Sequence, residues 1–543
     1  MTGPLIVQSD KTALLEVAHP DANDARHDLA VFAELERAPE HIHTYRITKL
    51  GLWNARAAGH DAAFVLGVLD RYAKFAIPSS VRVDIEQTMN RYGRLVIQRS
   101  EDGQLELSSD SPAILLEAAR HRKMAELLGG RLSETSYRIQ DWARGAVKQE
   151  LLKLGWPAED LAGYAEGTPH PIDLKESGWH IRDYQRLAVD KFWQGGSGVV
   201  VLPCGAGKTI VGAAAMTVAK TNTLILVTNT VSARQWKAEL LKRTSLTESE
   251  IGEYSGSTKE IRPITIATYQ ILTTKRKSEY AHLALLDAND WGLIVYDEVH
   301  LLPAPIFKMT ADLQARRRLG LTATLVREDG KEGDVFSLIG PKRFDAPWKE
   351  IEAQGYIAPA ACFEVRVDLG DAERLDYAMS SQDERYRLAA TSPVKIPVMQ
   401  NLLKQHAGEP TLIIGQYLDQ IYGVAEALGV PYITGETPVD ERERLFDQFR
   451  TGALNTLVVS KVANFSIDLP EASVAIQISG SYGSRQEEAQ RLGRLLRPKQ
   501  DGRKASFYTI IARDTVDQEF AQNRQRFLAE QGYSYEIRDA DEL

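Results

Sequence analysis

The sequence predicts two parallel-sheet α/β domains in tandem, preceded by a smaller N-terminal α/β domain. From residue 198 onward, short β-branched apolar segments alternate with helical patterns, which is typical of parallel sheets covered by crossover helices. The first set of expected strands is GVVVL, NTLILV, TIATY, GLIVYDE and RRLGLTAT, and the second is TLIIGQY, NTLVVSK, SVAIQIS and SFYTII. The length of 543 residues allows about three to four domains of roughly 150 residues each.

Chain breakers predict the domain boundaries. Pro341, Pro347, Gly355 and Pro359 separate the two sets of strands, and the loop AEGTPHPID occupies residues 165–173. Proline and glycine interrupt regular structure, so both stretches suit linkers. We therefore expect an N-terminal domain at 1–165, a first α/β domain at 166–345 and a second at 346–543.

Composition limits the class of protein. Hydrophobic residues make up 43% and charged residues 26% of the chain, and no uninterrupted apolar run approaches the length of a membrane span. The N-terminus lacks the basic start and long apolar segment of a secretory signal, and the chain has only two cysteines. These features predict a cytoplasmic protein in a reducing compartment, with no membrane partner.

The charge distribution is uneven, although the net charge is −9. Residues 1–40 contain three Lys or Arg and eight Asp or Glu, whereas residues 41–99 contain nine Lys or Arg and four acids. The basic segment is either a surface that contacts phosphates or an ordinary solvated face.

A nucleotide site is predicted at LPCGAGKT, residues 202–209, between an expected strand and the helical pattern TIVGAAAMTVAK. A glycine-containing turn before a helix lets backbone N–H groups bind phosphate, with Lys208 on the β and γ oxygens and Thr209 on magnesium. Leu202 replaces the first glycine of the longer pattern, so the match is the shorter G-x-G-K-T. The predicted binding residues are Gly205, Ala206, Gly207, Lys208 and Thr209, and the alternative is a glycine turn with a solvated lysine.

A pair of acids ends another expected strand, in GLIVYDEVH at residues 292–300. Asp297 can hold magnesium, and Glu298 can orient or deprotonate the attacking water. The pair favours hydrolysis of the nucleotide over binding alone.

A third group of polar residues lies in EEAQRLGRLLRPK, residues 487–499. On a helix, Gln490, Arg494 and Arg497 share one face, and arginines there can stabilise the developing charge on a γ-phosphate. The alternative is a basic amphipathic helix in water. With the phosphate loop in one α/β domain and the arginines in the other, ATP would close a cleft and hydrolysis would reopen it.

These segments resemble a known family. The G-x-G-K-T loop, DEVH at 297–300, TAT at 322–324 and QRLGRLLR at 490–497 resemble motifs I, II, III and VI of superfamily 2 helicases. RED at 327–329, SKVANFSIDLPEA, SGSYGSRQEEAQRLGRLLR and FLAEQGYSY resemble the short bacterial and archaeal form of the XPB branch, and HTYRITKLGLWNARAAG resembles the domain before its motor. The likeness covers about residues 41 to 535, and it implies two RecA-like motor domains.

The resemblance implies a role for each matching position. It implies the Walker A pair Lys208 and Thr209, the Walker B pair Asp297 and Glu298, and the sensors and fingers Gln490, Arg494 and Arg497. It places Gln185 and Arg182 of IRDYQ near the base, His300 between hydrolysis and strand contact, Thr322 and Thr324 in domain closure, and Arg327, Glu328 and Asp329 where DNA strands part. A helical stretch at 366–403 is either a reduced DNA-gripping thumb or a plain charged hairpin.

The resemblance implies a 3'-to-5' DNA helicase that needs Mg-ATP, binds single-stranded or forked DNA, and works in DNA repair as a monomer. One alternative is a double-stranded DNA translocase that does not separate strands. Another is an ATP-regulated DNA clamp that is the partner of a nuclease. An RNA helicase is less favoured, because DEVH replaces DEAD.

Overall fold

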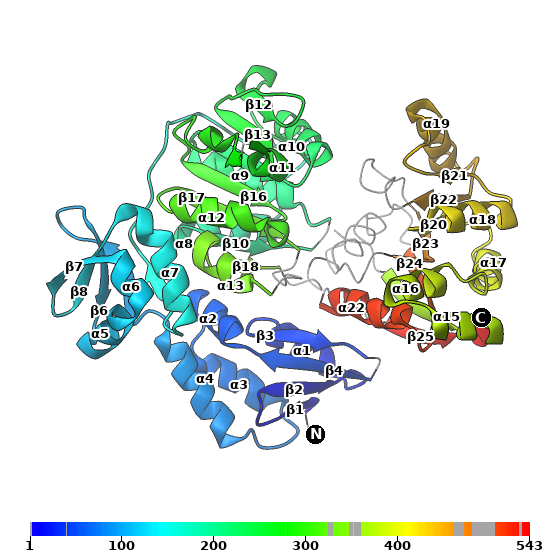
Figure 1. The fold of residues 1–543 in the computed structure, drawn as a ribbon, viewed down its shortest axis with the longest axis horizontal. Helices are drawn as coiled ribbons and strands as arrows, with labels where there is room; N and C mark the ends of the chain where they lie inside the picture. The colour runs from blue at the N-terminus through cyan, green and yellow to red at the C-terminus, as the bar shows by residue number, and fades with distance from the viewer. Residues whose placement is uncertain are drawn as a thin grey trace.

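The structure is a computed structural model that describes residues 3–39, 41–203, 205–276, 278–323, 330–346, 351, 360–460, 472–480, 505–530 and 535–543. Within these residues, four sheets of four or more strands organise the chain (Figure 1). No helix in the described part of the chain is long and apolar enough to cross a membrane.

The first seven-stranded unit follows the N-terminal third of the chain. Its strand order is β12-β13-β11-β16-β17-β10-β18, and all of its pairings are parallel. Ile225 and Val227 pack in the core on one face of the sheet, while Leu224 and Leu226 pack in the core on the other. The strands are β10 (Gly198–Val201), β11 (Thr223–Val227), β12 (Ile251–Tyr254), β13 (Ile264–Thr268), β16 (Leu293–Asp297), β17 (Arg317–Thr322) and β18 (Lys342–Asp345). The main helices are α8 (Asp183–Gly195), α9 (Lys208–Ala219), α10 (Thr230–Arg243), α11 (Tyr269–Thr273) and α12 (Ala304–Asp312).

The second seven-stranded unit repeats this architecture, with strand order β21-β22-β20-β23-β24-β19-β25 and parallel pairings. Its strands are β19 (Ala360–Val367), β20 (Thr411–Gly415), β21 (Tyr432–Ile433), β22 (Thr456–Ser460), β23 (Val474–Gln477), β24 (Ala505–Ala512) and β25 (Tyr535–Asp539). Its helices include α15 (Asp371–Met379), α16 (Gln382–Thr391), α17 (Lys395–Gln405), α18 (Leu418–Leu428), α19 (Val439–Arg450) and α22 (Val516–Glu530). The two units lie on opposite sides of the molecule in Figure 1. The predicted fold class, two parallel-sheet α/β domains in tandem, is confirmed.

All nine strands expected in these two units are present, and five further strands are not in the expected set. Four of the five, β12, β18, β21 and β25, are the edge strands of the two sheets. An edge strand has one neighbour and faces solvent, so it does not need the continuous apolar sequence of a central strand. The fifth, β19, carries Glu364 and Arg366 among its apolar residues, and these two side chains pair at 2.7 Å.

The N-terminal third contains two sheets with separate cores. The four-stranded unit has the order β1-β2-β4-β3 and the five-stranded unit has the order β7-β8-β6-β5-β9. The four-stranded unit comprises β1 (Leu5–Val7), β2 (Thr12–Glu16), α1 (Ala22–Leu29), β3 (Ala33–Arg37), β4 (Ile42–Ile47), α2 (Lys49–Ala57), α3 (Ala62–Tyr72) and α4 (Ser79–Arg91). The five-stranded unit comprises β5 (Leu95–Arg99), β6 (Leu105–Ser109), α5 (Pro112–Arg120), α6 (Arg122–Leu127), β7 (Leu128–Ser133), β8 (Ser136–Ile139), α7 (Arg144–Lys153) and β9 (Ala158–Asp160). The division of the whole chain at residues 165 and 345 stays a prediction.

The four-stranded unit contacts both seven-stranded units. Its Asn54 accepts a hydrogen bond through Oδ1 from the backbone N–H of Lys342 in β18, at 2.8 Å. Ala529 of α22 belongs to the hydrophobic core of the four-stranded unit, and α22 lies above β3 in Figure 1. A movement between the two seven-stranded units must therefore be accommodated at one of these two contacts.

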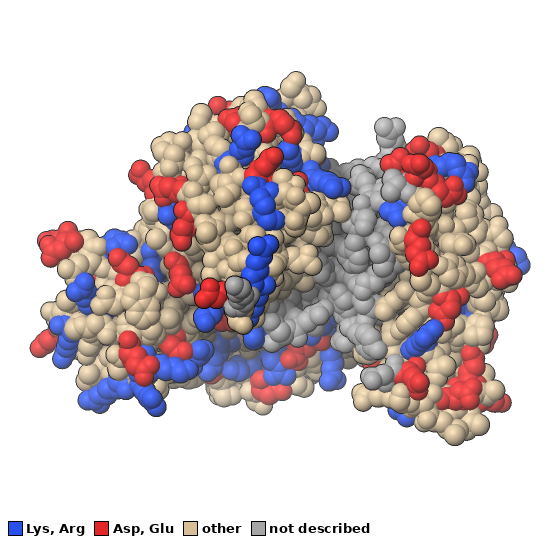
Figure 2. Space-filling view, turned by 45° about the horizontal axis from the view of Figure 1, so that its top comes forward, with Lys and Arg blue, Asp and Glu red and all other residues tan. Residues whose placement is uncertain are grey.

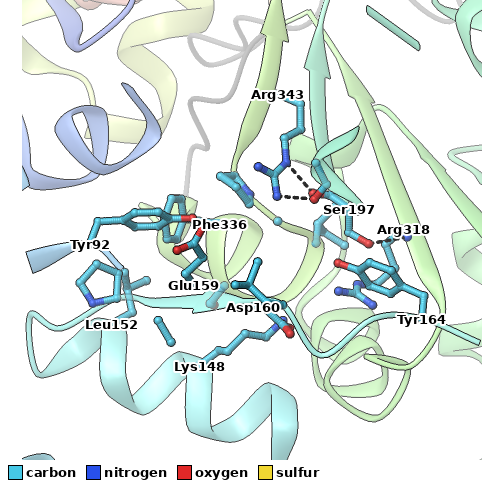
Figure 3. A pocket seen from close by; sticks show the side chains of 18 of the residues that line it. Tyr92, Lys148, Leu152, Glu159, Asp160, Tyr164, Ser197, Arg318, Phe336 and Arg343 are labelled. Atoms are coloured by element: carbon cyan, nitrogen blue, oxygen red, sulfur yellow. Dashed lines mark hydrogen bonds and ion pairs between the residues drawn. The ribbon is translucent and has the colours of Figure 1, made fainter. Parts of the chain in front are cut away.

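The five-stranded unit is joined to the first seven-stranded unit around a cavity of about 210 Å³ (Figure 3). Beside it, Asp160 accepts hydrogen bonds from Arg144 and Lys148, each at 2.8 Å. Burial opposes ionisation of Asp160, but the charges of Lys148 and Arg144 outweigh it and hold the pKa of that carboxyl below its usual range. Burial also lowers the pKa of Lys148 to about 8. Across the cavity, Arg343 donates to the backbone oxygen of Ser197 at 2.8 Å, which ties β18 to the start of β10.

Candidate nucleotide and nucleic-acid site

Three parallel strands bring the predicted site residues to one edge of the first seven-stranded sheet. Val201 at the end of β10 is in register with Thr322 at the end of β17, and Asp297 at the end of β16 is in register with Leu321. Because parallel strands share one direction, their carboxyl ends and the loops after them meet at the same edge. The phosphate loop, the DEVH segment and the TAT segment therefore lie side by side.

The phosphate loop has a backbone that only glycine adopts easily. Gly205 and Gly207 have φ angles of +81° and +82°, in the left-handed region. A Cβ on Gly207 would also lie 2.4 Å from Nε2 of Gln185, so the close approach of that side chain depends on this glycine. Gly207 is the N-cap of α9 and supplies no side chain to cap the first turn. The N-terminus of α9 can thus present backbone N–H groups to phosphate oxygens.

The IRDYQ segment at the start of α8 forms hydrogen bonds to the backbone of the phosphate loop. Tyr184 and Gln185 both donate to the backbone oxygen of Ala206, at 2.6 and 2.9 Å. The Oε1 atom of Gln185 accepts from the backbone N–H of Arg182 at 3.0 Å, and Arg182 Nη1 donates to the Tyr184 hydroxyl at 3.0 Å. In this structure the Gln185 amide therefore donates to the loop through Nε2 and is itself held by Arg182 through Oε1, and its predicted place near a base stays a prediction.

The acids of DEVH face the lysine of the phosphate loop. Lys208 Nζ lies 3.3 Å from Glu298 Oε1, and these side chains are 12% and 17% exposed. Glu298 has a φ of +49°, a left-handed conformation that is unusual for a residue with a side chain. Such backbone strain is concentrated at functional sites, where surrounding contacts maintain it. The structure thus brings together Lys208 and the two predicted acids.

Asp297 is fixed by three hydrogen bonds. Its Oδ2 accepts from the indole N–H of Trp236 at 2.9 Å, its Oδ1 accepts from the backbone N–H of Glu298 at 3.1 Å, and its backbone oxygen accepts from the hydroxyl of Tyr269 at 2.7 Å. Burial, assisted by the charge of Glu298, raises the pKa of Asp297 from 3.8 to about 6, against the hydrogen bond from Trp236. An ionised Asp297 is therefore costly in the absence of a cation.

This arrangement fits a magnesium nucleotide. Mg²⁺ prefers oxygen ligands, and the Thr209 hydroxyl and the Asp297 carboxylate are the oxygen donors that the sequence predicts for it. A cation next to Asp297 would offset the unfavourable burial of its negative charge. When bound, the magnesium nucleotide would supply the phosphoryl group for hydrolysis, and the role of Glu298 in orienting a water molecule stays a prediction.

His300 connects the DEVH segment to the TAT segment. Its Nδ1 lies 2.7 Å from the Thr322 hydroxyl and 3.6 Å from Glu298 Oε2. His300 is 9% exposed and Thr322 is fully buried, so this contact is shielded from water. His300 thus connects Glu298, an acid of the predicted hydrolytic site, to Thr322 at the end of β17, the strand that precedes the RED segment.

Several predicted site residues lie outside the described residues. They are Thr324, Arg327, Glu328, Asp329, Gln490, Arg494 and Arg497. Their roles stay predictions.

The basic segment at 41–99 is largely neutralised by acids in the same part of the molecule. Arg46 pairs with Glu36, Arg71 with Asp28 and Lys74 with Glu16, so the acidic residues 1–40 offset the basic segment locally. Figure 2 likewise shows Lys and Arg in a band along the lower edge of this face, with Asp and Glu among them. Lys49 and Arg56 differ, because they are exposed on one face of α2 and no ion pair joins either to an acid among the described residues.

The stretch at 366–403 is helical, as expected, and it contains α15, α16 and most of α17. Lys395 is 1% exposed and pairs with Asp517 at 2.8 Å, so this lysine supports the base of the hairpin and does not face solvent. Arg374 pairs with Asp368 and Arg387 with Asp419. Leu375 and Met379 of α15 are 62% and 79% exposed, one turn apart. The choice between a thumb and a plain hairpin stays open.

Sequence patterns did not indicate Tyr184, Trp236 or Tyr269 as site residues. Each donates one hydrogen bond to a site residue that lies more than 20 positions further along the chain. Trp236 and Tyr269 are buried apolar residues in amphipathic or short helices, a pattern that indicates a core position. The hydrogen bonds of their polar atoms to Asp297 can be identified only from the tertiary structure.

The fold and the motifs define an ATP-hydrolysing motor of helicase superfamily 2, and comparisons with known proteins agree. The family model for the ERCC3/RAD25/XPB C-terminal helicase matches residues 351–542. The model for the res subunit of type III restriction enzymes matches residues 179–327. A model described as a helicase conserved C-terminal domain matches residues 5–133, at the opposite end of this chain.

Relatives place the chain within one family. It is 68% identical over 541 residues to the DNA 3'-5' helicase XPB of Kineococcus radiotolerans, covering 100% of this chain and 97% of that protein. It is 64% identical to the DNA 3'-5' helicase XPB of Mycobacterium tuberculosis, covering 100% and 98%. It is 36% identical to the transcription and DNA repair factor IIH helicase/translocase subunit XPB of Encephalitozoon cuniculi, covering 98% and 82%. The chain therefore belongs to the XPB family of superfamily 2 helicases, and the predicted family resemblance is confirmed.

The raised pKa of Asp297 predicts that Asp297→Asn stabilises the protein without nucleotide or metal. At pH 7 the wild-type carboxylate is ionised although its pKa is raised to about 6. The neutral amide avoids that cost, and we expect a gain on the order of 1–3 kcal/mol. As the pH falls through 6 toward 4, the wild-type carboxyl binds a proton in the folded state first, so wild type becomes more stable and the gain shrinks. Thermal unfolding at pH 7 and pH 4.5 measures this.

Asp287→Asn is the matched control, because Asp287 is an exposed carboxylate in the same unit. It should leave the unfolding temperature nearly unchanged at both pH values. A lower unfolding temperature for Asp297→Asn at pH 7, or a gain that does not depend on pH, would contradict the account of Asp297.

Proposed function

We propose that this protein is an ATP-dependent 3'-to-5' DNA helicase that couples Mg-ATP hydrolysis to cleft closure and movement along DNA in DNA repair. The observation that supports it most is the meeting of Lys208, Asp297 and Glu298 at one sheet edge, with Lys208 and Glu298 3.3 Å apart. This is the arrangement that in-line phosphoryl transfer requires, since one group binds the phosphates and another orients the water. Membership of the XPB family supports DNA as the substrate.

Each residue at the edge has a proposed role in hydrolysis. Backbone groups of Gly205, Ala206 and Gly207 bind the phosphates, and Lys208 neutralises their charge. Thr209 and Asp297 hold Mg²⁺. Glu298 orients the attacking water and accepts its proton.

Residues from elsewhere complete the proposed site. Arg494 and Arg497 supply positive charge to the γ-phosphate from the second unit, and Gln490 acts beside them as a sensor, so the site forms only when the two units close. Arg182 and Gln185 hold the phosphate loop next to the base.

The contact between His300 and Thr322 is the proposed start of coupling to DNA. A change at Glu298 during hydrolysis would reach Thr322 through His300, because His300 Nδ1 lies 3.6 Å from Glu298 Oε2 and 2.7 Å from the Thr322 hydroxyl. From Thr322, Thr324 would carry the change to Arg327, Glu328 and Asp329 at the separating strands. The helical hairpin at 366–403 would grip the DNA as a reduced thumb.

A double-stranded DNA translocase is the second candidate. The observation in its favour is the name of the Encephalitozoon cuniculi relative, which is a helicase/translocase subunit. A DNA clamp that regulates a nuclease is less favoured, because an inactive ATPase has no need of Glu298 beside Lys208. We propose a cytoplasmic monomer that can act with a nuclease partner, with domains at 1–165, 166–345 and 346–543.

Replacing Glu298 by Gln tests the hydrolytic role. The amide cannot accept a proton from water, so we expect ATP turnover to fall by at least about a hundredfold, in line with the loss of general base catalysis. The phosphate loop is unchanged, so binding of ATP should persist. Turnover is measured by phosphate release and binding by equilibrium titration.

Lys208→Ala is the companion variant, and it should lose both binding and turnover. Near wild-type turnover in Glu298→Gln would remove Glu298 from the proposed chemistry. Loss of ATP binding in Glu298→Gln would show that the substitution damages the phosphate site itself.

We propose that Lys49 and Arg56, exposed on α2, contact DNA phosphates, and the salt dependence of DNA binding tests this contact. The double variant Lys49→Gln/Arg56→Gln removes two exposed cations, and we expect weaker DNA binding with a salt slope smaller by about two, since each phosphate contact releases about one counterion. The affinity for a forked DNA is measured between 50 and 200 mM salt, which is roughly the range over which such contacts act. Arg71→Gln is the control, because Arg71 already pairs with Asp28. An unchanged slope in the double variant would show that α2 does not contact DNA.

A further inference from the structure

Trp236 lies behind the carboxylate that is proposed to hold magnesium. It is on α10, it is 1% exposed, and its indole N–H donates to Asp297 Oδ2 at 2.9 Å. Hydrogen bonds to an ionised acceptor are stronger than those between neutral groups. The hydrogen bond from Trp236 therefore favours one orientation of the Asp297 carboxylate.

The phosphate-loop helix is shaped to admit this ring. A Cβ on Gly212 of α9 would lie 2.4 Å from Trp236 Cη2 and 3.1 Å from its Cζ3. These atoms belong to the six-membered ring, which has no freedom to move away in a fully buried position. Only glycine at position 212 thus leaves room for the indole against α9. The Trp236 ring therefore packs on the helix that begins at Lys208 and also hydrogen-bonds to the Asp297 side chain.

The other hydrogen bonds of Asp297 hold its backbone oxygen and one carboxylate oxygen, and Trp236 holds the second carboxylate oxygen. The Tyr269 hydroxyl holds the backbone oxygen of Asp297, and the Glu298 N–H holds Oδ1. The bond to Oδ2 then fixes the rotation of the carboxyl group. Each carboxylate oxygen can accept more than one bond, so the contact with Trp236 does not prevent coordination of a cation.

We propose that Trp236 is a positioning residue for the metal-bound nucleotide: its indole N–H orients Asp297 toward the phosphate loop and so sets the affinity for Mg²⁺ at the nucleotide site. The inference rests on the proposed function in one respect, namely that Asp297 is a metal ligand. Partners that orient a metal ligand typically change metal affinity by about ten to a hundredfold when removed.

The role needs both the shape and the N–H of tryptophan. The ring fills the space that Gly212 leaves, and its nitrogen reaches a carboxylate on a strand 61 residues further along the chain. Phenylalanine at position 236 would keep most of the apolar contact and remove the donor. The hydrogen bond can therefore be tested separately from the packing.

The experiment measures binding of ADP to Trp236→Phe by calorimetry, with and without Mg²⁺. We expect the affinity for ADP with Mg²⁺ to fall about tenfold and the affinity for ADP alone to stay unchanged. The concentration of Mg²⁺ that gives half-maximal ATP turnover should rise in the same proportion, with turnover recovering in excess Mg²⁺. Equal losses with and without Mg²⁺, or no loss, would overturn the proposal.

Trp291→Phe is the matched control. Trp291 is fully buried in the same unit, and its indole N–H donates to the backbone oxygen of Leu285 at 3.0 Å. The variant loses the same donor and a similar apolar contact, but far from any carboxylate in the site, so the Mg²⁺ dependence of ADP binding should match wild type. If Trp291→Phe changes that dependence as much as Trp236→Phe does, the effect is general destabilisation and the proposal fails.

A second variant covers the case in which Trp236→Phe does not fold. Replacing Trp236 by β-(3-benzothienyl)alanine puts sulfur in place of the N–H and keeps the shape of the ring. The same selective loss of ADP affinity in the presence of Mg²⁺ is expected, and wild-type binding would overturn the proposal.

Asp297→Asn separates failure of this inference from failure of the proposed function. If Asp297 is a metal ligand, this variant loses the increment in ADP affinity that Mg²⁺ provides. If the increment persists in Asp297→Asn, the assignment of the metal site is wrong. If it disappears in Asp297→Asn but is intact in Trp236→Phe, only the inference about Trp236 is wrong.

Discussion

Parallel pairing of β10, β17 and β16 is the constraint on which the site depends. The register of Val201 with Thr322 and of Asp297 with Leu321 places three loops at one edge of the sheet. Antiparallel pairing would send the ends of neighbouring strands to opposite edges, and Thr322 at the end of β17 could not meet His300, which follows β16. The rest of the first unit supports this edge: Tyr184 and Gln185 hold the phosphate loop, and Trp236 and Tyr269 hold Asp297.

The sequence predicted every central strand except β19, and it predicted the chemistry at the strand ends, because both depend on local pattern. A buried parallel strand is a short apolar run, and Lys208, Asp297 and Glu298 follow such runs directly. The edge strands escaped prediction, since β18 and β25 carry charged residues and contact only one neighbour. The residues that support the site were not predicted either, because their contacts join distant parts of the chain: the hydrogen bond from Trp236 to Asp297 spans 61 positions.

The charge balance of a sequence segment did not predict the charge of the corresponding surface, because ion pairs form between segments that are apart in the sequence. The segment at 41–99 is basic when counted by itself, yet Arg46 and Lys74 pair with Glu36 and Glu16 of the acidic segment before it. Adjacent strands and helices of one small unit bring these segments together. The remaining exposed cations of α2 lie in the unit that contacts both seven-stranded units, through Lys342 and Ala529.

We propose that hydrolysis at this edge drives strand separation on DNA. The most direct measurement follows ATP turnover and release of a labelled strand on forked DNA with a 3' tail, forked DNA with a 5' tail, blunt duplex, single-stranded DNA and RNA. The account predicts that 3'-tailed forks stimulate turnover and release the strand, and that 5'-tailed forks do not release it. Stimulation by blunt duplex with no release on any fork would contradict helicase activity and support a translocase. Turnover that does not respond to DNA would contradict a DNA motor of either kind.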